Sequence, residues 1–279
     1  MDDQIFSSID FVGQCLVDEK RIISFRKAIR QKIKRNDVVL DLGTGSGILA
    51  AMAAKAGARK VFAIEYDPFV ADIAKNIFRK NDLHNTVTVL KHDARKLSFK
   101  GKIAFNAILA EMLTTGMVDE HQVAAINNLH LRKLIDDSTV FIPERQETYA
   151  ALAHTTYSLY GLKTPMILHL WRWHNWRKLS LKKITRPILL NSVDFRKTNP
   201  DKFNSIIEFT ALSSGEINAI YLTSISVLAK NITVSDTEAL NAPMLIPIEK
   251  RRVTKDDIIR LRISYAFGGG YGTFKAQYT

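Results

Sequence analysis

The sequence predicts an α/β protein in two parts, a parallel sheet with crossover helices followed by a smaller and mainly β part. Short apolar runs alternate with helical patterns in the first half, which is typical of parallel β-α-β units. A glycine-rich turn joins the first of these runs to its helix. From about Pro143 onward the pattern is one of successive strands, so we expect one domain over residues 1–142 and a second over residues 143–279.

The elements can be predicted in order from apolar spacing. Residues 19–34 repeat apolar side chains at helical spacing and leave a basic outer face. Pro68 suits the first position of a later helix, with Asp67 as its N-cap. In the first half we expect helices at 19–34, 48–56, 68–81 and 117–134 and strands at 38–40, 61–64, 86–90 and 105–110. In the second half we expect strands at 166–173, 206–212, 217–228 and 258–265.

The composition is ordinary for a globular protein, with 46% hydrophobic and 24% charged residues in a chain of 279. Cys15 is the only cysteine, which excludes an intrachain disulfide and a cysteine metal cluster. The acidic start of the sequence lacks the apolar core of a signal peptide, and no apolar run reaches membrane-spanning length. We therefore expect a cytoplasmic protein with no membrane partner and no bound metal.

The stretch 38–68 carries the most specific pattern. An apolar run ends at Asp41, three glycines follow at alternate positions (Gly43, Gly45 and Gly47), and the next apolar run ends at Glu65. Glycines let a ligand lie against the backbone, and the free N–H groups of a helix N-terminus attract an anion. An acid at the end of the second strand can accept hydrogen bonds from both hydroxyls of a ribose. The pattern therefore favours a nucleoside ligand over a turn that binds nothing.

Two cofactors use such a site, a dinucleotide and S-adenosylmethionine. The dinucleotide pattern is G-x-G-x-x-G, whereas the spacing here is G-x-G-x-G with Asp41 ahead of it. This loop resembles the acidic, glycine-rich loop of the class I methyltransferases. The resemblance implies S-adenosylmethionine as cofactor and S-adenosylhomocysteine as product.

Two acids, Glu111 and Glu120, are nine residues apart across a loop that contains Gly116. Glu111 follows a predicted strand, at the edge where open α/β sheets bind ligands. Two carboxylates that converge can hold a guanidinium by paired, charge-assisted hydrogen bonds. Two alternatives stay open: a metal site, for which His121 is the one nearby additional ligand, and two unrelated acids.

The chain has a formal net charge of +12, and the excess is uneven. The stretch between Thr148 and Val193 holds no Asp or Glu, and it interleaves three tryptophans with basic residues over 171–186. This pattern allows a nucleic-acid partner, or a solvated basic face beside a partly buried aromatic strand. A basic acceptor would be favoured only if acidic residues gather at the pocket.

The motifs together resemble those of the protein arginine methyltransferases. The family's double-glutamate loop has two glutamates separated by eight residues, as Glu111 and Glu120 are. The family's segment ahead of the glycine loop, and its strand that leaves the cofactor domain, also have counterparts. The matching residues are Asp18-Glu19-Lys20-Arg21, Phe25-Arg26, the loop 41–47, Glu65, Glu111, Glu120 and Phe141-Ile142-Pro143.

The resemblance implies a Rossmann-like methyltransferase domain followed by a barrel-like substrate domain. It also implies a role for each matching residue. Arg21 would clamp the cofactor carboxylate, and Gly43 and Gly45 would contact the methionine portion. Glu65 would bind the ribose, Asp93 and Ala94 would flank the adenine, and Asp41 and Glu111 would complete the cofactor site. Glu111 and Glu120 would bind the acceptor guanidinium.

The sequence departs from this family at four places. The stretch 2–6 has no tyrosine where the family has a cofactor-covering Y-F-x-x-Y segment. No histidine follows His174 and no tryptophan follows Trp176, so the family's Thr-His-Trp loop is missing. Cys15 stands where the family has a bulky residue that limits the methylation state. No dimerisation arm is recognisable, so the family's arm dimer is not expected.

The acceptor is expected to be a protein, a peptide or a small molecule. The stretch 39–58 is also similar to the ribosomal-protein lysine methyltransferases, whose cofactor domain comes last, whereas here it comes first. Methylation of lysine, of a small molecule or of nucleic acid, and a cofactor-binding scaffold without turnover, are the alternatives. For an enzyme we expect in-line displacement, in which positioning and desolvation of the acceptor provide most of the rate.

Overall fold

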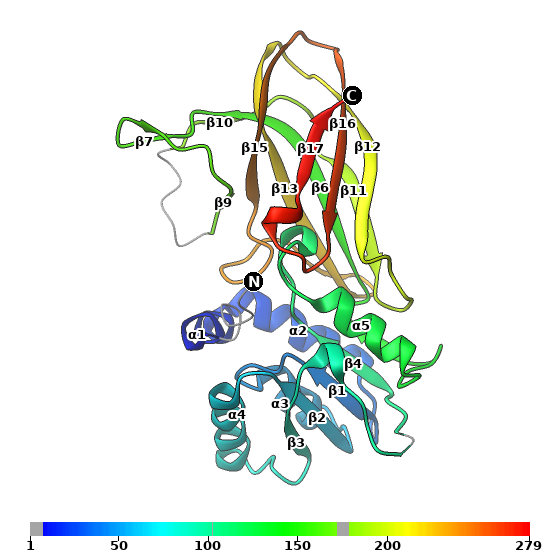
Figure 1. Cartoon of the computed structure of the whole chain (residues 1–279). Coiled ribbons are helices and arrows are strands. Elements are labelled where there is room, and N and C mark those ends of the chain that lie inside the picture. The colour runs from blue at the N-terminus through cyan, green and yellow to red at the C-terminus, as the bar shows by residue number, and fades with distance from the viewer. Residues whose placement is uncertain (1–7, 102, 172–178) are drawn as a thin grey trace.

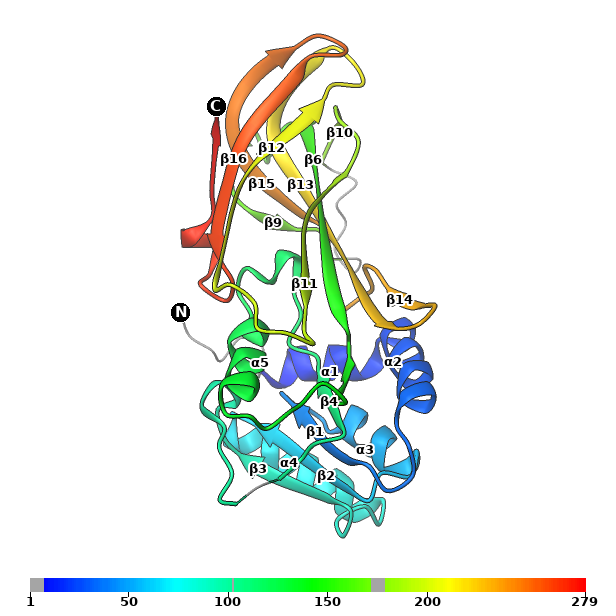
Figure 2. The ribbon, with the colours of Figure 1, turned by 90° about the vertical axis from the view of Figure 1, so that its right-hand side faces the viewer.

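The computed structural model describes residues 8–101, 103–171 and 179–279. A parallel sheet with helices forms the first half, and long antiparallel strands form the second (Figure 1). Helices α1 (Ile9–Val17) and α2 (Glu19–Lys32) lie at the level where the two halves meet, as the perpendicular view in Figure 2 also shows. The predicted succession of a parallel α/β half and a mainly β half is confirmed.

The parallel sheet has the order β3-β2-β1-β4-β5. Its strands are β1 (Val38–Leu42), β2 (Lys60–Glu65), β3 (Val87–Lys91), β4 (Ala107–Ala110) and β5 (Val140–Ile142). The chain fills one side of β1 first and then crosses to β4 on the other side. The carboxyl ends of β1 and β4 therefore flank a topological switch point, where open α/β sheets bind their ligands.

The helices of this half begin largely where the sequence predicts. Asp67 caps α4 (Pro68–Lys80), since its Oδ1 accepts from the N–H groups of Phe69 and Val70 at 2.8 and 3.0 Å. Asp18 caps α2 in the same way, through the N–H of Arg21 at 3.0 Å. Helix α3 (Ile48–Lys55) starts directly after the glycine loop.

Two helix predictions need correction. The helix predicted at 117–134 is only α5 (Gln122–Leu131), because residues 115–117 form a 3₁₀ turn in which Gly116 has a φ of 74°. Helix α1 was not predicted; it is capped by Ser8 and buries Val12. The tyrosine-free stretch 2–6 lies outside the described residues.

The described residues of the second half form three antiparallel sheets. The largest has the order β10-β6-β13-β15-β9, with β11 beside β6 and β14 beside β13; the others are β12-β16-β17 and the hairpin β7-β8. The strands are β6 (Arg145–Thr155), β7 (Ser158–Leu159), β8 (Leu162–Lys163), β9 (Leu168–His169), β10 (Leu181–Lys183), β11 (Ile188–Asp194), β12 (Lys202–Thr210), β13 (Gly215–Ala229), β14 (Ile232–Val234), β15 (Met244–Val253), β16 (Ile258–Ala266) and β17 (Lys275–Tyr278).

The strand predictions for this half were partly right. The strands expected at 206–212, 217–228 and 258–265 are confirmed as β12, β13 and β16 with shifted ends. The long strand expected at 166–173 is only the two-residue β9, and the end of that range lies outside the described residues. Strand β6 was missed, because its alanine-rich sequence has little intrinsic preference for a strand.

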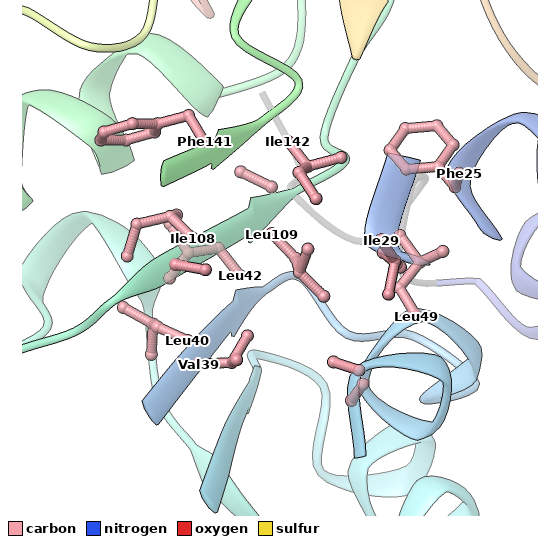
Figure 3. Packing of buried hydrophobic residues seen from close by; sticks show 14 of the residues in the cluster. Phe25, Ile29, Val39, Leu40, Leu42, Leu49, Ile108, Leu109, Phe141 and Ile142 are labelled. Atoms are coloured by element: carbon pink, nitrogen blue, oxygen red, sulfur yellow. The ribbon is translucent and has the colours of Figure 1, made fainter. Parts of the chain in front are cut away.

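The core of the parallel half extends into the β half. Figure 3 shows Phe25 and Ile29 of α2 near Leu49 of α3. Ile142 of β5 belongs to the same cluster and lies on the side of the α2 residues where the sheet is. The same buried cluster includes Phe195 and other residues of the second half, among them Val193, Leu228, Ala229, Val234 and Leu240. This shared core holds the two halves together. A second cluster fills the space between the antiparallel sheets.

Candidate active site

A cavity of about 490 Å³ opens at the carboxyl edge of the parallel sheet. The loops that follow β1, β2, β3 and β4 form one side of it. Helix α1 and segments of the β half form the other. Its lining includes Phe11, Cys15, Arg21, Gly43, Gly45, Glu65, Asp93, Ala94, Glu111, Asp119, Glu120, His169, Trp171 and Tyr271. The cavity thus brings together nearly all the residues that the sequence singled out.

At Gly43 and Gly47 the glycine loop is packed too closely to accept a side chain. Gly43 has a φ of 67°, and a Cβ there would lie 2.7 Å from Cγ of Met112. Gly47 has a φ of 82°, and a Cβ there would lie 2.3 Å from the ring of Phe78. Gly45, in contrast, faces the cavity and has only Val12 near its Cβ position, at 3.7 Å. The loop is therefore shaped by its packing and leaves its backbone open to a ligand.

Glu65 ends β2 and is only 3% exposed. Its Oε2 accepts from the N–H of Gly45 at 2.9 Å, and its Oε1 accepts from the N–H of Asp67 at 3.0 Å. These two backbone bonds hold the carboxylate beside the glycine loop, at the edge of the cavity. A carboxylate oxygen can accept more than one hydrogen bond, so this group can also bind the hydroxyls of a ligand.

Asp41 lies beneath the loop and does not line the cavity. Its Oδ2 accepts from the hydroxyl of Thr44 at 2.5 Å, and burial raises its pKa to about 7. The structure thus separates Asp41 from the other predicted cofactor residues, because its side chain braces the loop from below.

Asp93 and Ala94 line the cavity after β3. The Asp93 carboxylate is already engaged, because Nε and Nη2 of Arg95 donate to its two oxygens at 2.9 Å each. This planar, bidentate pair fixes both side chains at the wall of the cavity.

Arg21 and Glu111 form a buried ion pair in which Nη2 of the arginine donates to Oε2 of the glutamate. Nη1 of Arg21 donates to the carbonyl of Cys15 at 2.9 Å, and its buried Nε has no partner among the described residues. Burial lowers the pKa of the guanidinium, but the Glu111 carboxylate outweighs it and raises the pKa overall. An unpartnered donor in a buried cation indicates a place for an anion.

Glu120 lies in the same cavity and is 8% exposed. Burial, together with the charges of Glu111 and Asp119, raises its pKa well above the usual range. The charge of Arg21 acts in the opposite direction but does not outweigh these effects. Within the described part of the chain the Glu120 carboxylate makes no hydrogen bond or ion pair, so a positive group that entered the cavity could pair with it directly.

Sequence reasoning missed Asp119, His169 and Tyr271, which meet at this end of the cavity. The Tyr271 hydroxyl lies 2.6 Å from Oδ2 of Asp119 and 2.6 Å from Nε2 of His169. Trp171 stacks on His169 with 5.8 Å between ring centroids, and Phe11 of α1 lies edge-on to Trp171 at 6.2 Å. His169 and Trp171 thus bring a histidine and a tryptophan to the site. They come from an earlier part of the sequence than the family's Thr-His-Trp loop, which is missing here.

The described lining is acidic although the whole chain is basic. It contributes five carboxylates but only two guanidinium groups, those of Arg21 and Arg95. Low-dielectric walls focus such a charge excess. Acidic residues therefore gather at the pocket, which is the condition under which we expected a basic acceptor to be favoured.

Of the basic aromatic stretch 171–186, the structure describes residues 171 and 179–186. Trp171 belongs to the cavity, whereas the other two tryptophans lie at 172–178, outside the described residues. In the described remainder, Nζ of Lys183 lies 4.2 Å from the ring centre of Tyr221. A nucleic-acid partner for this stretch stays a prediction.

Two further features concern only the described residues. No group of three or more His, Cys, Asp or Glu side chains there is arranged to hold a metal ion. Across the same part of the chain, the helices are too short or too polar to span a bilayer.

Comparison with known proteins places this site in a family context. Residues 26–128 match the family model described as "Ribosomal protein L11 methyltransferase (PrmA)". A chain of the "Trypanosoma brucei PRMT1 enzyme-prozyme heterotetrameric complex with AdoHcy" shares the fold, with a TM-score of 0.76, 16% identity and 98% coverage of both chains. Protein arginine N-methyltransferase 7 of Drosophila persimilis is 33% identical over 153 residues, which is 51% of this chain and 22% of that protein.

The fold and the site together define a class I methyltransferase that resembles the protein arginine methyltransferases. Protein MJ1452 of Methanocaldococcus jannaschii is 33% identical over 262 residues, 94% of either chain. The chain belongs to the family of that protein. The predicted fold class, a Rossmann-like domain followed by a smaller barrel-like domain, is confirmed.

Proposed function

We propose that this enzyme transfers the methyl group of S-adenosylmethionine to the guanidinium of an arginine side chain. The observation that carries the proposal is that Glu111, which is partly buried, and Glu120, which is buried, share one acidic cavity with the glycine loop. The cofactor half of the proposal follows from the class of enzyme. The acceptor half depends on the charge and geometry of the two glutamates.

The cavity fits the cofactor at three places. The unpartnered Nε of Arg21 would meet the cofactor carboxylate, and the open face of Gly45 would lie against the methionine portion, with Gly43 beside it. The carboxylate of Glu65, at the edge of the cavity, would accept from the ribose hydroxyls. When bound, S-adenosylmethionine supplies a methyl group activated by its sulfonium.

Four predicted cofactor residues take more limited roles in this proposal. Asp41 would act through Thr44, by holding the glycine loop from beneath. Asp93 and Ala94 would flank the adenine, with Asp93 fixed by Arg95. Glu111 would orient Arg21 toward the cofactor carboxylate through their ion pair.

The acceptor would bind between Glu111 and Glu120. A guanidinium can donate to both carboxylates at once, which fixes the nitrogen that is to be methylated. Its arrival would also stabilise the ionised form of Glu120, whose pKa is raised in the free protein. Because the methylated nitrogen must lose a proton, a glutamate with a raised pKa is suited to accept it.

The test is methyl transfer from labelled S-adenosylmethionine to paired peptides. One peptide carries arginines in a neutral background, and its match carries lysines at the same positions. Amino-acid analysis of the product should find methylarginine from the first peptide and no label in the second. Label in lysine, in nucleic acid or in a small molecule would contradict the arginine assignment, and cofactor binding without transfer to any acceptor would favour the scaffold.

A further inference from the structure

The loop between β16 and β17 docks on the loop that carries Glu120, at the end of the β half that faces the parallel half (Figure 1). The N–H of Gly268 donates to the carbonyl of Met117 at 3.0 Å, and the N–H of Gly270 donates to the carbonyl of Val118 at 2.8 Å. A Cβ at position 268 would lie 3.1 Å from the carbonyl oxygen of Glu120. The glycines therefore let two backbones touch immediately before Glu120.

Tyr271 extends this contact from the backbone to the side chains. Its hydroxyl has one proton and donates it to the Asp119 carboxylate, so Nε2 of His169 must donate to the hydroxyl oxygen in turn. The other oxygen of Asp119 accepts from the hydroxyl of Thr114 at 2.6 Å. Asp119 is thus held on both oxygens, and it directly precedes Glu120.

Glu120 depends on this support, because its own carboxylate has no hydrogen-bond partner among the described residues. Its position is set by the backbone that carries it. A misplacement of about 1 Å in a reacting group can lower a rate about 100-fold. A side chain that fixes residues 117–120 would therefore control where the acceptor carboxylate lies.

We propose that Tyr271 is a positioning residue for methyl transfer, whose hydroxyl, held by Asp119 and His169, fixes the loop that carries Glu120. The proposal rests on the proposed function, because it assigns Glu120 to the acceptor. It makes the β16–β17 loop part of the acceptor site, although Tyr271 lies far from Glu120 in the sequence. His169 supports the tyrosine from β9, and their rings meet edge-on at 5.4 Å between centroids.

The variant to make is Tyr271→Phe, which removes the hydroxyl and keeps the ring against His169. Tyr278→Phe is the matched control, because the Tyr278 hydroxyl also makes a hydrogen bond, to the carbonyl of Glu249 at 3.0 Å, but lies outside the cavity. We expect Tyr271→Phe to lower kcat about 10- to 100-fold, with cofactor affinity unchanged, and Tyr278→Phe to match the native enzyme.

Combination with Glu120→Gln distinguishes positioning from a general loss of structure. If Tyr271 acts through Glu120, the double variant should be little slower than Glu120→Gln alone. If the fold-loss in rate of the double variant equals the product of the two single fold-losses to within about twofold, Tyr271 acts independently of Glu120 and the proposal is wrong.

Amide hydrogen exchange provides a readout that needs no turnover. The amides of Gly268 and Gly270 should exchange about fivefold faster or more in Tyr271→Phe, and at the native rate in Tyr278→Phe. Unchanged exchange in Tyr271→Phe would overturn the proposal even if its activity falls. If the native protein methylates no acceptor while exchange responds as expected, the proposed function fails and the fixing of the loop by Tyr271 is supported.

Discussion

Replacement of Glu120 by glutamine tests the acceptor site most directly. The change keeps the size of the side chain and removes its ability to ionise. A carboxylate that holds a guanidinium contributes two charge-assisted hydrogen bonds, together about 3–4 kcal/mol, so methyl transfer to arginine should fall about 10²- to 10³-fold. Cofactor affinity, measured by calorimetry, should not change.

The same variant has an expected effect on stability. Because the folded-state pKa of Glu120 is raised, the folded chain binds more protons than the unfolded chain as the pH rises above the usual glutamate value of 4.5. The contribution of Glu120 to the free energy of unfolding therefore falls as the pH rises through that window. Glutamine does not ionise, so the Glu120→Gln protein does not lose stability in this way. Glu120→Gln should be as stable as the native protein at neutral pH, or more stable.

A matched control is available on the surface. Glu208 of β12 is paired with Arg260 and is 56% exposed, so Glu208→Gln makes the same chemical change outside the cavity and should leave the rate unchanged. The assay is the initial rate of labelled methyl transfer to the arginine peptide. If Glu120→Gln methylates the natural acceptor at the native rate, the assignment of the two glutamates is wrong, and only the cofactor half of the site remains.

Four further predictions concern the cofactor, the acceptor and the assembly. Calorimetry should show binding of S-adenosylmethionine and S-adenosylhomocysteine in preference to a nicotinamide dinucleotide; tighter binding of the dinucleotide would contradict the interpretation of the glycine loop. Glu65→Ala removes a charged acceptor for two hydroxyls and should weaken cofactor binding at least about tenfold in a protein whose circular dichroism is native. Acceptor KM should fall as the pH rises through the raised pKa of Glu120, because the acceptor binds its ionised form; a flat profile would contradict this. Light scattering should show a monomer or a dimer other than the family's arm dimer, and a dimer whose interface maps to the projecting β7-β8 hairpin would refute that expectation.

Local chemistry explains why part of the site was predictable. The glycines and Glu65 each follow from residues a few positions apart, whereas only the family resemblance singled out Arg21. Glu111 is also recognisable locally, because it directly follows the buried strand β4 at the switch point. Secondary structure was less predictable wherever packing overrides propensity, as in alanine-rich β6 and in the turn at Gly116 that delays α5.

The sequence by itself determined the cofactor loop, the order of the two parts and the nine-residue spacing of the two glutamates. Tertiary structure alone decided how the acceptor end is built. Asp119, His169 and Tyr271 lie up to 152 residues apart, and only the packing of the β half on the parallel half brings them to one cavity. It also decided the charge of the site, since a chain of net charge +12 gathers its carboxylates where the loops converge. The physical reason is that backbone and apolar patterns act locally, whereas hydrogen bonds and charges act between whatever groups the fold brings together.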